Sequence, residues 1–274
     1  MSEPILEMKN ISKNFGSVIA LKNVDLEVYP GEIRGLIGEN GSGKSTISSI
    51  AAGMQKATSG RMTFKKQSWE PASMIDALQN GIGMVVQESG TISGVTVAEN
   101  IFLAELSQFR NKLGMINKKA MNQKATEAMR AIGVEHVIGD MPIDSLDFQT
   151  RKLVEIAKVM LKNPDILVID ETSTALSQDG REIMYSLIRK LRDSGKAIIF
   201  ISHDLEEIME VCDTLTVLRD GNLIRTFKKE EFNADEIRTS MIGRELQGDY
   251  YRRNFPQSSQ KEAAITATNL KYKE

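Results

Sequence analysis

A glycine-rich loop between two apolar segments is the feature that most restricts how this chain can fold. The loop reads Gly38-Glu39-Asn40-Gly41-Ser42-Gly43-Lys44-Ser45 and fits the pattern G-x-x-x-x-G-K-[ST]. Residues 33–37 before it have the composition of a strand, and residues 45–52 after it that of a helix ending at Gly53. The sequence therefore predicts an α/β unit in which a strand turns directly into a helix.

The chemistry of this loop favours a phosphate ligand. Glycines allow successive backbone N–H groups to converge on phosphate oxygens, and the helix that follows adds its dipole to the anion site. Lys44 would supply positive charge to the β- and γ-phosphates, and Ser45 would offer a hydroxyl to Mg²⁺. A glycine-rich turn without a ligand is the alternative. The candidate nucleotide-binding residues of the loop are Gly38, Asn40, Gly41, Ser42, Gly43, Lys44, Ser45 and Thr46.

Three more apolar runs, 82–86, 166–169 and 197–201, predict strands buried on both faces of a sheet. Between the last two runs, apolar residues recur at helical spacing at Ile183, Leu187, Ile188 and Leu191. A strand, a helix and a strand in this order predict a parallel βαβ crossover. The strand 197–201 is therefore predicted to run parallel to the strand that enters the glycine-rich loop.

Polar residues follow two of these strands. Asp170 and Glu171 come directly after 166–169, where the first can hold the shell of a magnesium ion and the second can polarise a water. A solvated pair of acids is the alternative. His203 follows 197–201 and would face the same crevice as the loop, because the carboxyl ends of parallel strands meet at one edge. Its alternative is a purely structural role.

The rest of the chain predicts two further units. Alternating patterns around 6–11 and 24–28, with a turn at Pro30-Gly31, predict an antiparallel β-rich entry. The interval from about 95 to 161 lacks β-rich runs and carries helical patterns at 118–130 and 153–161. It is predicted to be an inserted helical subdomain.

The chain's last part changes character twice. A strand at 222–227 and a helix at 234–242 are predicted to close a domain spanning 1–246. Residues 247–262 are polar and without periodicity, as in a linker. Residues 263–274 then resemble the opening of the chain, so they are interpreted as the start of a truncated second copy.

Composition excludes several classes of protein. Of 274 residues, 41% are hydrophobic and the net charge is −2, so no strong field favours nucleic acid. The one cysteine, Cys212, cannot form an intramolecular disulfide, and with only two histidines a Cys/His metal cluster cannot be assembled. No apolar run approaches a membrane span and no signal peptide is recognised, so any membrane association is expected to be peripheral.

In order and spacing, these motifs resemble the nucleotide-binding domain of ABC transporters across residues 4–245. The resemblance implies the fold class α/β: a P-loop NTPase with an ABC-type antiparallel β subdomain, a parallel-sheet core and an inserted α-helical subdomain. It also implies ATP and Mg²⁺ as cofactors. Phe15 corresponds to the aromatic residue that stacks on adenine, although core packing is its alternative.

The same resemblance assigns three residues around the phosphates. Gln87 corresponds to the glutamine that touches the metal site together with Ser45 and Asp170. Glu171 corresponds to the catalytic carboxylate, and His203 to the histidine that contacts the γ-phosphate. Lys44, Gln87, Glu171 and His203 are accordingly the candidate catalytic residues.

A closer resemblance is to the ATPases of monosaccharide importers, carried by residues 81–88, 96–103 and 154–158. In that subgroup two such domains are commonly fused in one chain. The resemblance implies ATP hydrolysis that drives solute import from the cytoplasmic face of the cell membrane. Implied partners are membrane permease subunits, a second nucleotide-binding domain and, indirectly, a periplasmic or lipid-anchored solute-binding protein.

The sequence departs from the family at its signature loop. Where the family has Leu-Ser-Gly-Gly-Gln, spacing places Leu146, Asp147, Phe148, Gln149 and Thr150. In the family this loop presents a serine hydroxyl and glycine amides to the γ-phosphate of a partner domain. Asp147 would instead place a carboxylate against a phosphate, and the bulky neighbours would hinder close approach. Thr172 and Ser177 replace the family's usual proline and D-loop aspartate.

These departures predict one competent and one degenerate ATP site in each pair of domains. A non-hydrolysing or regulatory ABC domain is one alternative. A soluble ABC ATPase not linked to transport is another. A basic face or a long coiled-coil insertion would favour that alternative, and the sequence shows neither. A GTPase is disfavoured, because Asn117-Lys118-Lys119-Ala120 lacks the aspartate of the guanine-specific N-K-x-D pattern.

Overall fold

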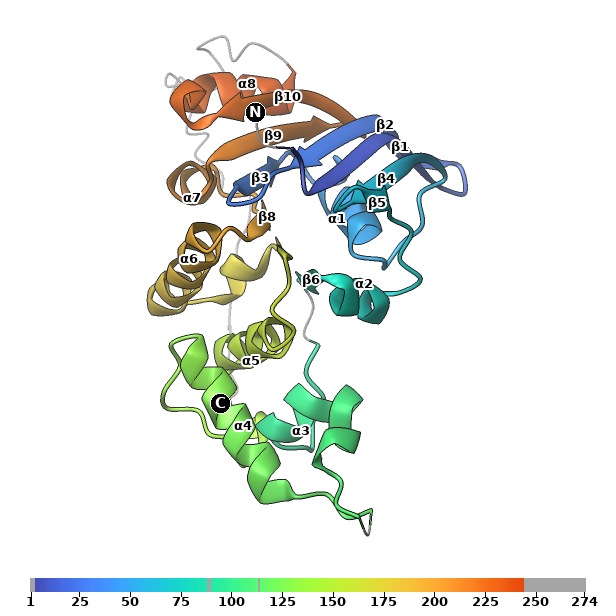
Figure 1. Cartoon of the computed structure of the whole chain (residues 1–274). Helices are drawn as coiled ribbons and strands as arrows, with labels where there is room; N and C mark the ends of the chain where they lie inside the picture. The colour runs from blue at the N-terminus through green and yellow to red at the C-terminus, as the bar shows by residue number, and fades with distance from the viewer. Residues whose placement is uncertain (1–2, 88–89, 113, 244–274) are drawn as a thin grey trace, which may run out of the picture. The chain divides into compact units, whose positions relative to one another are not determined.

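The computed structural model describes residues 3–87, 90–112 and 114–243. A six-stranded sheet in the order β10-β9-β3-β8-β7-β6 runs through it (Figure 1). All neighbouring pairs are parallel except β9 and β10, which form an antiparallel hairpin. The strands are β3 (Ile33–Ile37), β6 (Ile82–Val85), β7 (Ile166–Asp170), β8 (Ala197–Ile201), β9 (Thr214–Arg219) and β10 (Asn222–Lys228).

A second, antiparallel sheet has the order β2-β1-β4-β5. Its strands are β1 (Leu6–Phe15), β2 (Val18–Val28), β4 (Ser59–Phe64) and β5 (Gln67–Ser68). The first two strands are longer than the alternating patterns predict, because β1 continues past residue 11 and pairs with β2 up to Phe15 and Val18. The chain then turns at Pro30-Gly31 and enters β3, as predicted.

Helix α1 (Lys44–Ala51) lies between the two sheets and buries Ile47 and Ile50 there (Figure 1). The strands of the mixed sheet are buried on both faces, so consecutive residues enter different cores. Val168 packs in the core around α1, and Leu167 packs in the core on the opposite face. The remaining helices outside the insertion are α2 (Met74–Asn80), α6 (Gln178–Asp193), α7 (Leu205–Val211) and α8 (Ala234–Ile242).

Between β6 and β7 the chain forms a helical unit in which α3 (Val97–Phe102), α4 (Lys118–Ala131) and α5 (Phe148–Met160) pack on one another (Figure 1). Its 3₁₀ turns are η1 (Leu103–Phe109) and η2 (Ile143–Ser145), and two more, η3 (Thr172–Ala175) and η4 (Lys229–Glu231), lie elsewhere. Helix α5 begins five residues before the predicted start at 153, because the Asp147 side chain caps its first turn.

The fold class is confirmed: an antiparallel β subdomain, a largely parallel sheet and an inserted helical unit are all present. The predicted linker at 247–262 and the predicted second copy at 263–274 lie outside the described residues. Within the described ranges, none of the helices combines the length and apolar character needed to cross a membrane.

Gly35 on β3 gives a test of the packing. A Cβ atom at this position would lie 2.9 Å from Cys212 Sγ and 3.2 Å from Ile208 Cδ1, both fully buried. We expect Gly35→Ala to lower the free energy of unfolding by about 1–3 kcal/mol, because the close-packed neighbours must shift. Urea denaturation measures this loss. The double variant with Cys212→Ala should recover part of it, and an unchanged urea midpoint for Gly35→Ala would contradict this packing.

Candidate nucleotide-binding site

The glycine-rich loop joins β3 to α1, as predicted. Gly41 and Gly43 have φ values of 81° and 107°, a region that favours glycine. A Cβ atom on Gly43 would also lie 2.9 Å from the carbonyl oxygen of Ala20. Asn40 and Gly41 are exposed at the tip of the loop, whereas Thr46 is half-buried on α1.

Two features of the loop fit an anionic ligand. Helix α1 has no side-chain cap at Gly43, so the free N–H groups of its first turn are not satisfied by a side chain. Ser42 Oγ is buried and has no hydrogen-bond partner in the described part of the chain. A phosphate at a helix N-terminus satisfies donors of this kind.

Lys44 brings a buried positive charge to the same place. Its Nζ donates to the carbonyl oxygens of Gly38 at 2.9 Å and Glu39 at 3.1 Å, and the residue is 4% exposed. Burial lowers the pKa of this ammonium group, against the opposing effect of the Glu171 and Asp170 carboxylates. The loop therefore holds a cation that is paired with backbone dipoles rather than with a hydrogen-bonded carboxylate.

Asp170 lies opposite the loop at the end of β7. Ser45 Oγ donates to Asp170 Oδ1 at 3.1 Å, so the two oxygen ligands proposed for Mg²⁺ are adjacent. Burial raises the pKa of the Asp170 carboxyl, although the hydrogen bond from Ser45 acts in the opposite direction. Hard oxygen donors of this kind suit Mg²⁺. The described residues contain no group of three or more His, Cys, Asp and Glu side chains that would form a separate metal site.

Residues that follow three strands, β6, β7 and β8, meet at the Glu171 carboxylate. Gln87, after β6, donates from Nε2 to Glu171 Oε2 at 3.1 Å. His203, after β8, has its Nδ1 atom 3.9 Å from the same oxygen. Glu171 itself has φ of 44°, an unfavourable conformation for a residue other than glycine. The structure therefore brings together Gln87, Glu171 and His203, to which the resemblance assigns a metal contact, the catalytic carboxylate and the γ-phosphate contact.

Phe15, at the end of β1, is 45% exposed, and Lys13 Nζ lies 4.9 Å from the centre of its ring. This exposure excludes the alternative that the ring is part of the core. An open aromatic face beside a lysine is compatible with stacking against a flat ligand.

The five residues that the resemblance places at the signature position span the start of α5, from Leu146 before its N-cap to Thr150 in its first turn. Asp147 is the N-cap, and its carboxylate accepts from the backbone N–H of Thr150 at 2.7 Å. This contact with Thr150 lowers the pKa of Asp147, so the side chain carries its charge at neutral pH. Gln149 Oε1 accepts from the backbone N–H of Ser177, which ties the loop to the start of α6. Leu146 lies just before the cap and Phe148 is 53% exposed.

A buried ion pair that was not predicted from the sequence lies next to this loop. Lys152 Nζ on α5 donates to Glu155 Oε2 at 2.9 Å and to the carbonyl oxygen of Val86 at 2.8 Å. Glu155 Oε1 in turn accepts from Gly90 N–H. The pair thus ties α5 to the segment that carries Gln87. Two charged residues on an otherwise apolar helix face are the signal that would have indicated it.

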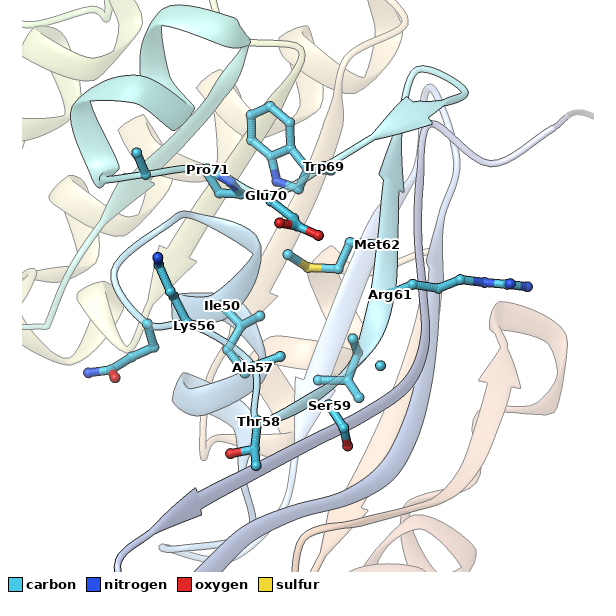
Figure 2. A pocket seen from close by; sticks show the side chains of 14 residues that line it. Ile50, Lys56, Ala57, Thr58, Ser59, Arg61, Met62, Trp69, Glu70 and Pro71 are labelled. Carbon is cyan, nitrogen blue, oxygen red and sulfur yellow. The ribbon is translucent and has the colours of Figure 1, made fainter.

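A pocket of about 310 Å³ lies apart from these residues, between β4, the end of α1 and Trp69 (Figure 2). The Trp69 indole N–H donates to the carbonyl oxygen of Ala51 at the end of α1. None of the motif residues described above lines this pocket. It is therefore separate from the candidate nucleotide site.

The fold and this arrangement define an ATP-binding cassette, a class of P-loop ATPase domain. Comparison with known sequences agrees, since the ABC transporter family profile matches residues 21–174. The ribose import ATP-binding protein RbsA 2 of Escherichia coli O157:H7 is 41% identical over 246 residues, which cover 89% of this chain and 48% of that protein. This chain belongs to the ABC transporter family.

Further relatives support the same assignment. The ribose import ATP-binding protein RbsA of Streptococcus agalactiae serotype III is 38% identical over 90% of this chain and 49% of its own length. The chain thus spans about half the length of the curated relatives it matches. Among solved structures, the ADP conformation of MJ1267, an ATP-binding cassette of an ABC transporter, gives a TM-score of 0.75 at 26% identity, covering 89% of this chain and 100% of that one.

The raised pKa of Asp170 gives a test by pH. The folded chain binds this proton more tightly than the unfolded chain, so the contribution of Asp170 to stability falls as the pH rises through the raised pKa. We expect Asp170→Asn, without nucleotide or metal, to melt a few degrees higher than the wild type at about pH 8. The gain should shrink as the pH is lowered, because the carboxyl then becomes protonated in the wild type. Differential scanning fluorimetry measures both.

The control for this comparison is Asp140→Asn, because Asp140 is an exposed carboxylate in the helical unit between α4 and η2. It should show no comparable gain at about pH 8. A lower melting temperature for Asp170→Asn than for the wild type at that pH would contradict a net cost of burying the charge.

Proposed function

We propose that this chain binds ATP with Mg²⁺ and hydrolyses it to power import of a monosaccharide or a similar small solute. The observation that carries the proposal is the convergence of Lys44 and Ser45 with Asp170 and Glu171 at one edge of the sheet. Relatives named as ribose import ATP-binding proteins, similar over most of this chain, support the solute class.

The phosphates would be held by the glycine-rich loop. In this proposal phosphate oxygens replace the carbonyls that Lys44 Nζ contacts, and the free N–H groups of α1 complete the cradle. Ser45 and Asp170, with Gln87 beside them, would hold the metal. Mg²⁺ supplies neutralisation of the charge that develops on the phosphates.

Glu171 would orient the attacking water and accept its proton. Its carboxylate is fixed on one side by Gln87 and faces His203 on the other. His203 is more than half exposed, so it is free to meet the γ-phosphate when nucleotide is present. Phe15 would stack on the adenine ring at the outer end of the site.

Replacing Glu171 with glutamine tests the hydrolytic role. Gln is isosteric with Glu but cannot accept the proton, so turnover should fall by about 10²–10⁴-fold while ATP binding is retained. Steady-state phosphate release and equilibrium dialysis with ATP measure the two properties. Lys44→Ala is the matched variant that should lose binding as well. Turnover equal to that of the wild type would contradict a catalytic role for Glu171.

We propose membrane permease subunits as the partners, on the cytoplasmic face of the membrane. Large apolar side chains remain exposed on the helical unit and the segment leading to it, at Ile92, Leu103 and Met115. Apolar side chains that stay exposed favour contact with another protein where they form one patch. The region between Gln87 and this unit is the proposed docking surface, and a solute-binding protein would act on the permease from the other side.

A second cassette is the other proposed partner, either fused or separate. The relatives are about twice as long as this chain, which supports a fused arrangement. We propose that residues 1–246, with the helical subdomain at about 95–161, form the first cassette. Residues 247–262 would be the linker, and 263–274 would begin the second cassette.

Within such a pair, we propose that the signature loop of this chain completes only a degenerate site. Asp147 is charged at neutral pH and would face the γ-phosphate bound by the partner. Gln149 is already engaged with the backbone of Ser177. The site formed by Lys44, Glu171 and the partner's loop would be the competent one.

Asp147→Ser tests this asymmetry. Serine is about as good an N-cap as aspartate, so the substitution removes the charge while keeping the first turn of α5. We expect steady-state ATP hydrolysis by the two-cassette assembly to increase. Asp147→Ala is the control that removes both the charge and the cap, at a cost of about 1 kcal/mol of stability. Unchanged hydrolysis by the serine variant would show that this loop does not limit one site.

The altered signature loop also favours a second candidate function, a regulatory cassette that binds ATP without hydrolysing it. The Glu171→Gln comparison separates the two. A regulatory cassette would show the same negligible turnover for the wild type and the variant, with ATP binding intact in both.

A further inference from the structure

Helix α7 carries a buried carboxylate that the proposed nucleotide site does not use. Glu207 is 6% exposed and lies in the first turn of α7, where the helix dipole favours negative charge. In the described ranges no lysine, arginine or histidine forms an ion pair with it. It is held instead by three hydroxyl groups, from Ser173, Ser202 and Tyr185.

One oxygen of this carboxylate joins two loops. Glu207 Oε2 accepts from Ser173 Oγ at 2.8 Å and also from Ser202 Oγ. Ser173 comes two residues after Glu171, and Ser202 comes directly before His203. Both serines are almost completely buried. A single buried atom therefore bridges the segment that presents the proposed catalytic carboxylate and the segment that presents the proposed γ-phosphate contact.

The other oxygen of the carboxylate makes a separate contact. Glu207 Oε1 accepts from the Tyr185 hydroxyl on α6, and the Tyr185 ring packs edge-to-face on Phe200 with centroids 6.4 Å apart. Burial raises the pKa of Tyr185, so the hydroxyl remains a donor at neutral pH. This contact links Glu207 to α6 and does not join the two loops.

The contacts of Glu207 with Ser173 and Ser202 lie next to a backbone position of unfavourable conformation. Glu171 has positive φ, and its N–H donates to the carbonyl oxygen of Ile201 at 3.0 Å. The two segments are thus joined once through the backbone and once through Glu207. A non-glycine residue in the left-handed region persists when surrounding contacts fix it.

We propose that Glu207 is a positioning residue that fixes the Glu171 carboxylate relative to His203 by bridging Ser173 and Ser202. The inference rests on the proposed ATP hydrolysis, in which these two side chains act on one phosphate. Without the bridge the folded chain still binds nucleotide through the glycine-rich loop, because none of the loop residues touches Glu207. The loss then falls on turnover rather than on binding.

The test compares two bridge variants with a control that keeps the bridge. Ser173→Ala and Ser202→Ala each remove one arm, whereas Tyr185→Phe removes a hydrogen bond to the same carboxylate outside the bridge. Measured on the 274-residue chain with ATP and Mg²⁺, each serine variant should lose about 10-fold or more in kcat with KM within about 2-fold. Tyr185→Phe should retain kcat within about 2-fold. The double serine variant should be no worse than the worse single variant, since both break one bridge.

Glu207 itself gives a conservative rescue. Glu207→Gln keeps an oxygen that can accept from both serines, and it should retain most of the turnover that Glu207→Ala loses. Equal losses in the serine variants and in Tyr185→Phe, or additive losses in the double variant, would overturn the inference.

Hydrogen–deuterium exchange separates failure of this inference from failure of the proposed function. Ser202→Ala should speed exchange in a peptide containing Glu171 and Ser173, across the bridge, and Tyr185→Phe should not. If the wild type binds ATP without hydrolysing it, the proposed function fails, and this exchange pattern still decides whether the bridge exists. Unchanged exchange at Glu171 in Ser202→Ala would refute the bridge even in an active ATPase.

Discussion

The parallel pairing of β3 with β8, and of β8 with β7 and β7 with β6, is the constraint on which the site depends. Parallel strands end at the same edge of a sheet, so four separate stretches of sequence must present their following residues together. That edge receives the glycine-rich loop from one strand and Gln87, Glu171 and His203 from the others. The order of the strands therefore assembles the site before any side chain contributes binding energy.

The residues of the proposed nucleotide site are electrostatically unfavourable on their own. Burial lowers the pKa of Lys44 and raises that of Asp170, so each group is pushed toward its neutral form. Ser42 Oγ is buried without a partner among the described residues, and α1 has no side-chain cap. Each of these features costs stability, and each would become favourable with the proposed phosphate and divalent cation in place.

The elements best predicted from the sequence are those in which buried apolar residues form a clear local pattern. The strand 197–201 and the helix 234–242 were predicted with the observed bounds, because apolar runs and caps identify them locally. Strand β4 and helix α7 were not predicted. Their residues are partly exposed or belong to a short helix, so their placement depends on tertiary pairing. The exposure of the Phe15 ring could not be predicted either, since an aromatic residue at a strand end can pack in the core or stack on a ligand.

Contacts between distant segments were beyond the reach of any local pattern. The Glu207 carboxylate meets Ser173 across 34 positions of sequence, and the positive φ of Glu171 has no signal in its residue type. The residues at the proposed signature and D-loop positions show a related limit. Asp147 caps α5, and Ser177 caps α6. Both are satisfied within their own chain, so neither is a folding defect. Because both residues fit the fold, the structure alone gives them no special role. Their proposed effect is on the groups that the loop can present to a partner domain, and only comparison with the family motif points to that effect.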